Sequence, residues 1–413
     1  MKEPTTSEVP QIRFRGCDGI WEEKRLGAIC AIGDADHWMP KTTSHGIPYV
    51  MTGDFCGINE IDFENAKSIS EADFEKLSRK IKPELGDILF ARYASVGAVR
   101  HIHTTRKFIA SYSCAILKSN NSFNSEYLFF LLQSDKTQNQ LKQSINTGSQ
   151  GNIGIESLKQ LVSLFPDKTE QTKIGEYFRD LDRLIGLHQR KHDKLVTLKK
   201  AMLQKMFPQP GAITPEIRFK GFSEAWKEKE LGELVIFFKG KGLSKSEIDP
   251  SGTEPCIHYG QLFTEYSEVI STVISRAKGG NSYFRSIAND VLMPTSDVTP
   301  RGLAKASAIN ESDVIIGGDI LVIRGDKKLL LGSFLSRFIR YMESQVLQMV
   351  SGSTVFHLYS SSMEKFRVKY PSVSEQQKIG TYFCTLDTLI SKHTIQLQKL
   401  QQIKSACLEK MFV

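Results

Sequence analysis

The chain has 413 residues, of which 40% are hydrophobic and 24% charged, and its formal net charge at pH 7 is +8. This balance is typical of a globular protein and excludes a disordered, collagen-like or small disulfide-rich chain. No stretch approaches ~18 consecutive apolar residues, and the first ten residues lack the apolar core of a signal peptide, so we expect a cytoplasmic protein.

The chain contains two copies of one pattern, 205 residues apart. The copies open on Pro10-Gln-Ile-Arg-Phe-Arg-Gly16 and Pro215-Glu-Ile-Arg-Phe-Lys-Gly221, each followed by Trp and Leu-Gly. They close on blocks 166–207 and 371–412, which are identical at about 21 of 42 positions. The stretches between, about 28–165 and 233–370, align poorly. The sequence therefore indicates a tandem duplication that kept a scaffold while two inserts diverged.

Each insert is predicted to be an α/β globule. Short apolar runs bounded by turn residues predict strands, and each insert also contains one clear helix that stops at a glycine. The first insert has predicted strands at Asp87–Phe90 and Ile109–Leu117 and a helix from Ser125 to about Ile145, capped by Gly148. The second has strands at Leu234–Phe238, Val291–Met293 and Ile320–Ile323 and a helix from Ser333 to about Val350, capped by Gly352.

Each closing block predicts one long amphipathic helix, because apolar side chains recur at seven-residue steps after Pro166 and after Pro371. The seam positions are Ile174, Leu181, His188 and Leu195 in the first helix and Ile379, Leu386, His393 and Leu400 in the second. Two such stripes in one chain predict an antiparallel coiled coil with a pseudo-two-fold axis. His188 and His393 should then lie at one level, as a polar layer that fixes the register.

The predicted fold class is therefore α/β, with two α/β domains joined by two long helices in a tandem repeat. The domain boundaries are 1–165 for the first globular domain and 166–212 for the first helix. The second domain covers 213–370 and the second helix 371–413.

Motifs for catalysis and metal binding are weak in this sequence. Phe238-Lys-Gly240-Lys-Gly242 has the spacing of the F-x-G-x-G loop of S-adenosylmethionine-dependent methyltransferases, but no Asn-Pro-Pro-Tyr tetrapeptide follows it. No G-x-x-x-x-G-K-[ST] or H-E-x-x-H motif occurs, and the seven cysteines are scattered, with no C-x-x-C spacing. We therefore expect reduced thiols and no catalytic residue, metal ligand or cofactor in this chain.

Basic, aromatic and hydroxyl-bearing residues gather in loops of both inserts. With the positive net charge they favour a DNA partner, since such side chains contact phosphates and base edges. The candidates in the first insert are Arg92, Tyr93, Ser95, Arg100, His101, Ser149, Gln150 and Asn152. Those in the second are Lys241, Lys245, Thr295, Ser296, Arg301, Ser353, Thr354 and His357. A solvated loop explains any one of them equally well, and only their occurrence in both inserts favours DNA binding.

The repeated head pattern and the repeated Glu-Gln-x-Lys-Ile-Gly-x-Tyr-Phe-x-x-Leu-Asp-x-Leu-Ile block resemble, over the full chain, the specificity subunits of type I restriction-modification systems. The resemblance implies two target recognition domains that each read one half of an interrupted double-stranded DNA site, with the helices setting the spacing. It also implies two modification subunits that bind S-adenosylmethionine and methylate adenine, and restriction subunits that use ATP and Mg. This chain would then be a non-catalytic subunit.

Three other interpretations stay open. The chain could be the DNA-specificity subunit of a two-subunit restriction enzyme, which would share the layout. A structural coiled-coil adaptor would show no sequence-specific DNA binding, and a free-standing methyltransferase would bind S-adenosylmethionine by itself. The sequence does not supply the recognised bases or the spacer length.

Overall fold

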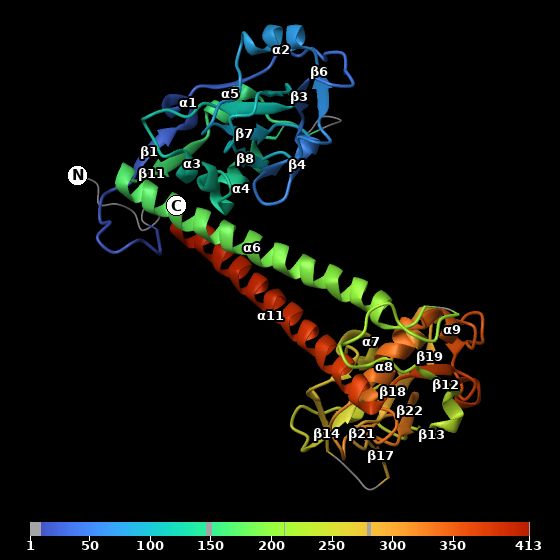
Figure 1. Ribbon diagram of the computed structural model, residues 1–413. Helices are drawn as coiled ribbons and strands as arrows, with labels where there is room; N and C mark the ends of the chain where they lie inside the picture. The colour runs from blue at the N-terminus through green and yellow to red at the C-terminus, as the bar shows by residue number, and fades with distance from the viewer. Residues whose placement is uncertain (1–9, 146–150, 210, 279–281, 413) are drawn as a thin grey trace. The chain divides into compact units, whose positions relative to one another are not determined.

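The computed structural model describes residues 10–145, 151–209, 211–278 and 282–412 (Figure 1). The chain divides into two compact units. Unit 1 comprises Met1–Lys191 and His393–Val413, and unit 2 comprises His192–Lys392. Each unit therefore holds one globular domain and about half of each of two long helices, α6 (Lys168–Met206) and α11 (Val373–Met411).

The domain of unit 1 combines an antiparallel four-stranded sheet, a three-stranded sheet and two strand pairs. The four-stranded sheet has the order β2 (Ile32–Asp34), β10 (Cys114–Leu117), β7 (Ile88–Ala91), β8 (Val99–His101). The other strands are β6 (Lys67–Ile69), β3 (Ile47–Val50) and β9 (Ile109–Ala110) in one sheet, β1 (Glu22–Arg25) with β11 (Val162–Phe165), and β4 (Phe55–Cys56) with β5 (Glu60–Ile61). Its helices are α1 (Leu26–Ile29), α2 (Glu71–Ser78), α3 (Ser125–Leu131), α4 (Asp135–Gln143) and α5 (Ile155–Lys159).

The domain of unit 2 has the same mixed character around a five-stranded sheet. Its order is β13 (Val235–Lys239), β22 (Ile320–Gly325), β18 (Val291–Pro294), β20 (Ser307–Ile309), β15 (Val269–Ile270). The other strands are β16 (Ser275–Ala277), β14 (Glu254–Ile257), β21 (Ile315–Ile316) and β17 (Phe284–Arg285) in one sheet, β12 (Lys227–Glu230) with β24 (Arg367–Tyr370), and β19 (Ser296–Asp297) with β23 (Phe356–His357). Its helices are α7 (Gln261–Thr264), α8 (Gly332–Tyr341), α9 (Glu343–Leu347) and α10 (Ser360–Met363).

Three predicted elements are wrong in detail, because each is divided in two in the structure. The helix predicted from Ser125 to about Ile145 is two helices, since the Ser134 hydroxyl accepts a hydrogen bond from the Thr137 amide and caps a second helix. The strand predicted at Ile109–Leu117 is two strands, because Ser111 and Ser113 form a turn with their hydroxyl oxygens 2.6 Å apart. The helix predicted from Ser333 to about Val350 is likewise divided, at Met342.

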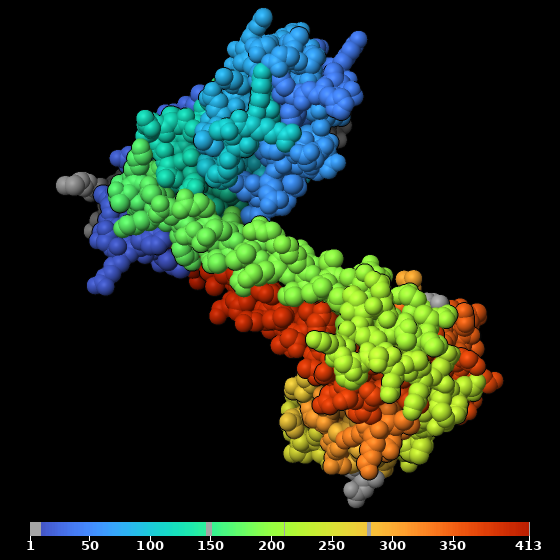
Figure 2. Space-filling view, in the orientation of Figure 1, coloured from blue at the N-terminus to red at the C-terminus, as the bar shows by residue number. Residues whose placement is uncertain are grey.

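The long helices run antiparallel within unit 1. The Tyr177 hydroxyl lies 3.6 Å from the Cys407 sulfur, whereas His188, further along α6, meets His393, earlier in α11, with 2.9 Å between their Nδ1 atoms. The prediction that antiparallel pairing brings these two histidines to one level is confirmed. In Figure 2 the C-terminal part of α11 (red) lies directly against α6 (green).

The same antiparallel contact occurs within unit 2, between the C-terminal part of α6 and the N-terminal part of α11. The Lys199 ammonium lies 2.6 Å from the Asp387 carboxylate, and the same ammonium lies 2.9 Å from Glu268 in the loop before β15. Arg337 of α8 is buried and donates to Asp387 at 2.8 Å. A network of charges therefore holds the helix pair to the domain of this unit.

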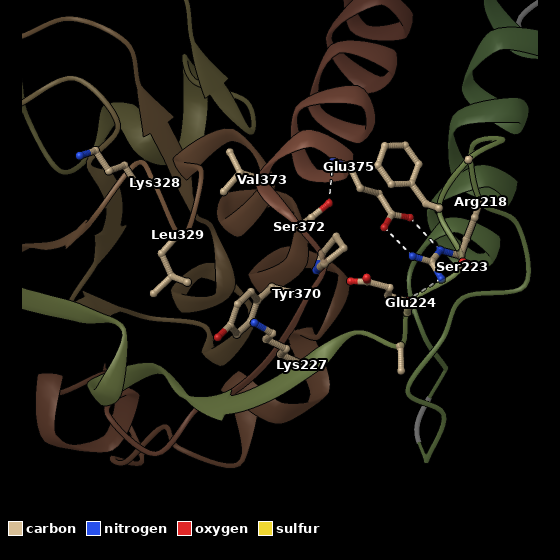
Figure 3. Close-up of a pocket in the computed structure, with 14 residues that line it drawn as sticks. Arg218, Ser223, Glu224, Lys227, Lys328, Leu329, Tyr370, Ser372, Val373 and Glu375 are labelled. Atoms are coloured by element: carbon tan, nitrogen blue, oxygen red, sulfur yellow. Dashed lines mark hydrogen bonds and ion pairs between the residues drawn. The ribbon is translucent and has the colours of Figure 1, made fainter.

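A bidentate ion pair explains two of the repeated motifs. The Arg13 guanidinium donates from Nε and Nη2 to the Glu170 carboxylate, at 2.9 and 2.6 Å, and Arg218 makes the same two bonds to Glu375 at the same distances. In each copy the first residue of the pair comes from the Ile-Arg-Phe head and the second from the Glu-Gln block. Figure 3 shows the Arg218 pair beside an open pocket of about 480 Å³. The duplication has thus preserved a clasp between the head and the start of each long helix.

The Gln and Gly of the repeated block dock each long helix on its own domain. The Gln171 side-chain oxygen accepts from the Asn124 amide at 2.8 Å, and Gln376 accepts in the same way from the Leu331 amide at 2.9 Å. A side chain at Gly175 would lie about 3.0 Å from Asn124 and 3.1 Å from the backbone nitrogen of Tyr127. Glycine therefore avoids a tight contact where α6 passes the start of α3.

Each unit has a core to which the ends of the long helices contribute. In unit 1, Phe412 packs on the rings of Tyr127 and Phe178. In unit 2, the side chain of Phe207, just beyond α6, is fully buried among other aromatic rings. No helix in the described part of the chain combines the length and the apolar character needed to cross a bilayer.

Candidate nucleic-acid interface

The two domains place a short backbone bridge at equivalent positions. In unit 1, Tyr93 bridges Asn152, and the Ile153 amide donates to the Arg92 carbonyl at 3.1 Å. In unit 2, Ser296 pairs with His357, and the Leu358 amide donates to the Thr295 carbonyl at 3.0 Å. We call Tyr93 with Asn152, and Ser296 with His357, the bridge pairs. Four of the predicted DNA-binding residues form these pairs.

Aromatic side chains surround the bridge pair of unit 1. The Tyr93 ring lies edge-on to Tyr112, at 6.2 Å between centroids, and His37 stacks on Tyr112 at 4.9 Å with the ring planes 23° apart. His37 is largely exposed, with 58% of its side-chain surface accessible. Ser95 lies beside this cluster in a turn that holds Ala94 at a φ of 55°, and its side chain is exposed.

The bridge pair of unit 2 lines a pocket of about 500 Å³. Thr295, Ser296 and His357 contribute polar groups, and His357 stacks on the exposed ring of Tyr359 at 6.1 Å with the ring planes 27° apart. Lys239 adds a positive charge 3.6 Å from Asp319. The structure thus brings three sequence-predicted residues into one pocket with two aromatic faces and a cation.

Arg92 occupies a different environment from the one predicted. Its side chain is buried and forms an ion pair with Asp34, and its Nε donates to the Ile153 carbonyl at 3.0 Å. Nη1 also donates to the Tyr112 carbonyl at 3.2 Å. With Nε and Nη1 engaged inside the protein and the side chain buried, Arg92 is placed to hold the Tyr93–Asn152 bridge rather than to reach a base.

Replacing Arg92 with alanine is expected to destabilise unit 1 by about 2 kcal/mol, because it removes a buried charge-assisted hydrogen-bond set and leaves Asp34 with weaker compensation from Lys80. Arg301→Ala is the matched control, since 84% of the Arg301 side chain is exposed and its ion pair with Glu343 lies at the surface. That variant should stay within ~0.5 kcal/mol of the parent protein. Calorimetric unfolding of both variants measures the difference, and equal stabilities would contradict the assignment.

Two further basic residues of the first insert also bond to groups of their own domain. The Arg100 guanidinium donates to the carbonyls of Glu60 and Cys56, at 2.9 and 3.1 Å, in the β4–β5 hairpin. His101 is buried, with Nε2 2.9 Å from the Ser125 hydroxyl and Nδ1 3.0 Å from His103. Burial, aided by the neighbouring His103, lowers the pKa of His101 to about 4. This imidazole is therefore neutral at pH 7 and cannot act as a phosphate-binding cation.

The buried neutral His101 is expected to make unit 1 less stable in acid. An unfolded histidine has a pKa near 6.5, so between about pH 6.5 and pH 4 the unfolded state binds more protons than the folded state. Stability should fall as the pH is lowered through this window, by up to about 3 kcal/mol at ~1.4 kcal/mol for each pH unit. The difference between the unfolding free energies of the parent and His101→Gln, measured from pH 7 to pH 4, isolates this effect. A constant difference would contradict it.

The remaining predicted residues lie in surface segments. Lys241, Lys245, Ser353 and Thr354 are exposed. Ser149 and Gln150, and the predicted cap Gly148, lie outside the described residues. The sequence did not single out His37, Tyr112 and Tyr359, although a tyrosine between two serines inside the apolar run 109–117 is a signal for a turn.

The glycines of the F-x-G-x-G pattern have a packing role. A side chain at Gly240 would lie 2.0 Å from the Gly317 carbonyl oxygen, and Gly242 has a φ of +68°. The Gly318 amide donates to the Gly242 carbonyl at 2.8 Å. Glycine is required here by the neighbouring turn. Among the described residues, no three His, Cys, Asp or Glu side chains come together as a metal site.

Comparison with known proteins decides the family. The model of the type I restriction modification DNA specificity domain matches residues 19–197 and again residues 223–405. The chain belongs to this family. Each match covers one globular domain and most of the long helix that follows it, so one specificity domain is one copy of the tandem repeat.

Two named specificity subunits are similar in sequence, and one solved structure is similar in fold. The chain is 23% identical over 365 residues to a Methanocaldococcus jannaschii protein named as the specificity subunit of the type I restriction enzyme MjaX, covering 84% of this chain and 81% of that one. It is 17% identical over 195 residues to the MjaVIII specificity subunit of the same organism, covering 46% of this chain and 42% of the relative. The crystal structure of the type I restriction-modification S subunit from M. genitalium has the same fold, with a TM-score of 0.60, 18% identity and coverage of 98% and 99% of the two chains.

Proposed function

We propose that this chain is the non-catalytic DNA specificity subunit of a type I restriction-modification complex, in which each specificity domain reads one half of a bipartite, interrupted DNA site. One observation carries the proposal. The two domains share a scaffold, including the Arg13–Glu170 and Arg218–Glu375 clasps, yet they differ in the side chains of their bridge pairs. Two different reading surfaces on one repeated scaffold suit a site whose two halves differ in sequence.

The partners proposed are two modification subunits, which would bind S-adenosylmethionine, and restriction subunits, which would use ATP and Mg. Apolar side chains are exposed on the long helices in both units. Exposed apolar surface of this kind is typical of a site where another protein binds. In unit 1 they are Leu184, Leu187 and Ile395, and in unit 2 they are Val196, Leu198 and Leu389. Leu184 and Leu389 are equivalent under the 205-residue shift and both are 38% exposed, so this one repeated apolar position supports a partner that is present twice.

Mapping of methylated adenines in whole genomes tests this function. Cells that carry the modification subunits with this chain should show methylation at a bipartite motif, and cells without the chain should lose it. The same motif should disappear when the chain alone is exchanged for another member of the family. Methylation that is independent of this chain would contradict the proposal.

The affinity of the assembled complex for DNA should fall steeply with salt. Each phosphate neutralised by Lys or Arg releases counterions, so the logarithm of the binding constant drops by about 0.9 per phosphate for each tenfold rise in salt concentration. Titration of a labelled duplex at salt concentrations from ~50 to 200 mM measures the slope. A flat response would argue against contact with the DNA backbone.

A further inference from the structure

The two bridge pairs occupy equivalent positions in the two copies of the repeat. Asp87 of unit 1 and Asp290 of unit 2 are both buried, and each accepts a hydrogen bond at 2.8 Å from the backbone amide three residues before it. The strands that follow these aspartates, β7 and β18, lead after the same number of residues to Tyr93 and to Ser296. The partner residues Asn152 and His357 are separated by the 205-residue repeat.

The backbone is the same at this position, whereas the side chains differ. In both units the amide of the residue after the second bridge residue donates to the carbonyl that precedes the first bridge residue, at 3.1 and 3.0 Å. The side chains are a phenol and a carboxamide in unit 1 and a hydroxyl and an imidazole in unit 2. All four are half-buried, so each is supported by the domain and still accessible from outside.

The surroundings fit a base edge better than a bare phosphate. A histidine–tyrosine stack occurs at each bridge pair: in unit 1 His37 stacks on Tyr112, which contacts Tyr93, and in unit 2 the bridge residue His357 itself stacks on Tyr359. Carboxamide, hydroxyl and imidazole groups can both donate to and accept from the atoms that distinguish base pairs in the major groove. The Arg92 charge is buried in an ion pair with Asp34, whereas Lys239 forms an exposed ion pair with Asp319, 3.6 Å away.

We propose that the bridge pairs are the specificity-determining residues of the two domains, with Tyr93 and Asn152 selecting bases in one half-site and Ser296 and His357 selecting bases in the other. This inference rests on the proposed function and adds to it the atoms that read the sequence. Arg92 acts as a positioning residue, because it holds the segment that carries Asn152 through the Ile153 carbonyl.

The test exchanges the side chains between equivalent positions. His357→Asn gives the second domain the residue of the first, and Asn152→His gives the reverse exchange. The full chain is expressed with its modification subunits, and methylated adenines are mapped genome-wide. His357→Asn should change the preferred base in one half-site only, and Asn152→His in the other only, while the gap stays constant. Exposed residues outside the pairs, Lys365→Ala in unit 2 and Lys136→Ala in unit 1, are the matched controls and should leave the motif intact.

A binding measurement tests the inference even if a complex with an exchanged side chain methylates DNA poorly. Purified complexes with Ser296→Ala, which removes one hydroxyl, are titrated with duplexes that carry single base changes in either half-site. Loss of one specific contact should reduce discrimination at one base pair by roughly 5- to 150-fold, which corresponds to about 1–3 kcal/mol. Discrimination in the other half-site should not change.

The outcomes distinguish failure of the role proposed for the bridge pairs from failure of the specificity function proposed for the chain. An unchanged motif in both exchange variants, with normal methylation and unaltered discrimination by Ser296→Ala, would overturn the role of the bridge pairs and leave the specificity function standing. An equal loss of affinity on all duplexes would also overturn it, since the pairs would then contact the DNA backbone. Absence of any chain-dependent motif with the parent protein would instead overturn the proposed function itself.

Discussion

Inserting four helix-forming residues into each long helix, after Gln189 in α6 and after Ser391 in α11, is expected to widen the gap between the two half-sites by about one to two base pairs. Four residues add ~6 Å at ~1.5 Å per residue, and B-DNA rises ~3.4 Å per base pair. The insertion also turns each helix by only about 40° beyond a full turn, because four residues are roughly 1.1 turns. The bases in each half-site should stay the same, since the domains are unaltered.

The structure decides where such an insertion belongs. Both positions are one residue beyond the His188–His393 layer, so the two added segments face each other in the antiparallel pair. A position after Lys199 is unsuitable, because Lys199 bonds to Glu268 and Asp387, and the helix beyond it enters the core of unit 2.

A matched control is the same insertion in α6 alone. It displaces the apolar face of α6 relative to α11, and we expect it to lower stability rather than to yield a clean new gap. Genome-wide mapping of methylated adenines gives the gap directly. If the variant with both insertions folds, and its complex methylates sites with the original gap, the helices do not determine the spacing between the half-sites.

Phe207→Ala is expected to destabilise unit 2 by about 3–5 kcal/mol, the range found when a fully buried aromatic side chain is truncated. The Phe207 ring contacts Phe334 and Tyr341 at 5.6 and 5.3 Å between centroids, and it also packs on Trp226 from the head of the second copy and Phe383 of α11. Its loss would therefore leave a cavity where three parts of the unit meet.

The duplication supplies the matched variant. Phe412 is the counterpart of Phe207 at the end of the second long helix, and it packs in the core of unit 1. Its surface is 5% exposed, and its ring contacts Tyr127 and Phe178. Phe412→Ala should destabilise unit 1, by less than Phe207→Ala destabilises unit 2. Amide hydrogen exchange separates the two effects, because protection should fall in α8 for one variant and in α3 for the other. Loss of protection in both units from either variant would contradict this assignment.

The duplicated parts of the fold could be predicted because repetition supplies information that one copy lacks. The equivalence of His188 and His393 fixed their meeting point once the helices were taken as antiparallel, and the structure agrees. The break at Ser134 had a local signal, a serine followed by Asp, but the helix period continued through it and concealed the break. Met342 carries no such signal, since its side chain makes no capping hydrogen bond.

The candidate site could be predicted only in part, because burial depends on residues far away in the sequence. Arg92 has the composition of a DNA contact, yet its charge is compensated by Asp34, 58 residues away. His101 is neutral because β8 and α3 bury it. By contrast, Tyr93, Asn152, Ser296 and His357 were among the predicted residues, and the bridges that pair them are long-range backbone contacts that no local pattern reveals.

Each long helix contributes to both units, and this determines the order in which the two units can fold during synthesis. All residues of unit 2, His192–Lys392, are consecutive, so this unit can close as soon as the ribosome has released that stretch. Unit 1 begins earlier but lacks His393–Val413, including the Phe412 ring of its core, until the last part of this sequence has emerged. The domain that is translated first is therefore finished last. Until then the rings of Tyr127 and Phe178 lack the Phe412 ring that packs on them, which leaves apolar surface of unit 1 available for mispairing and for chaperones.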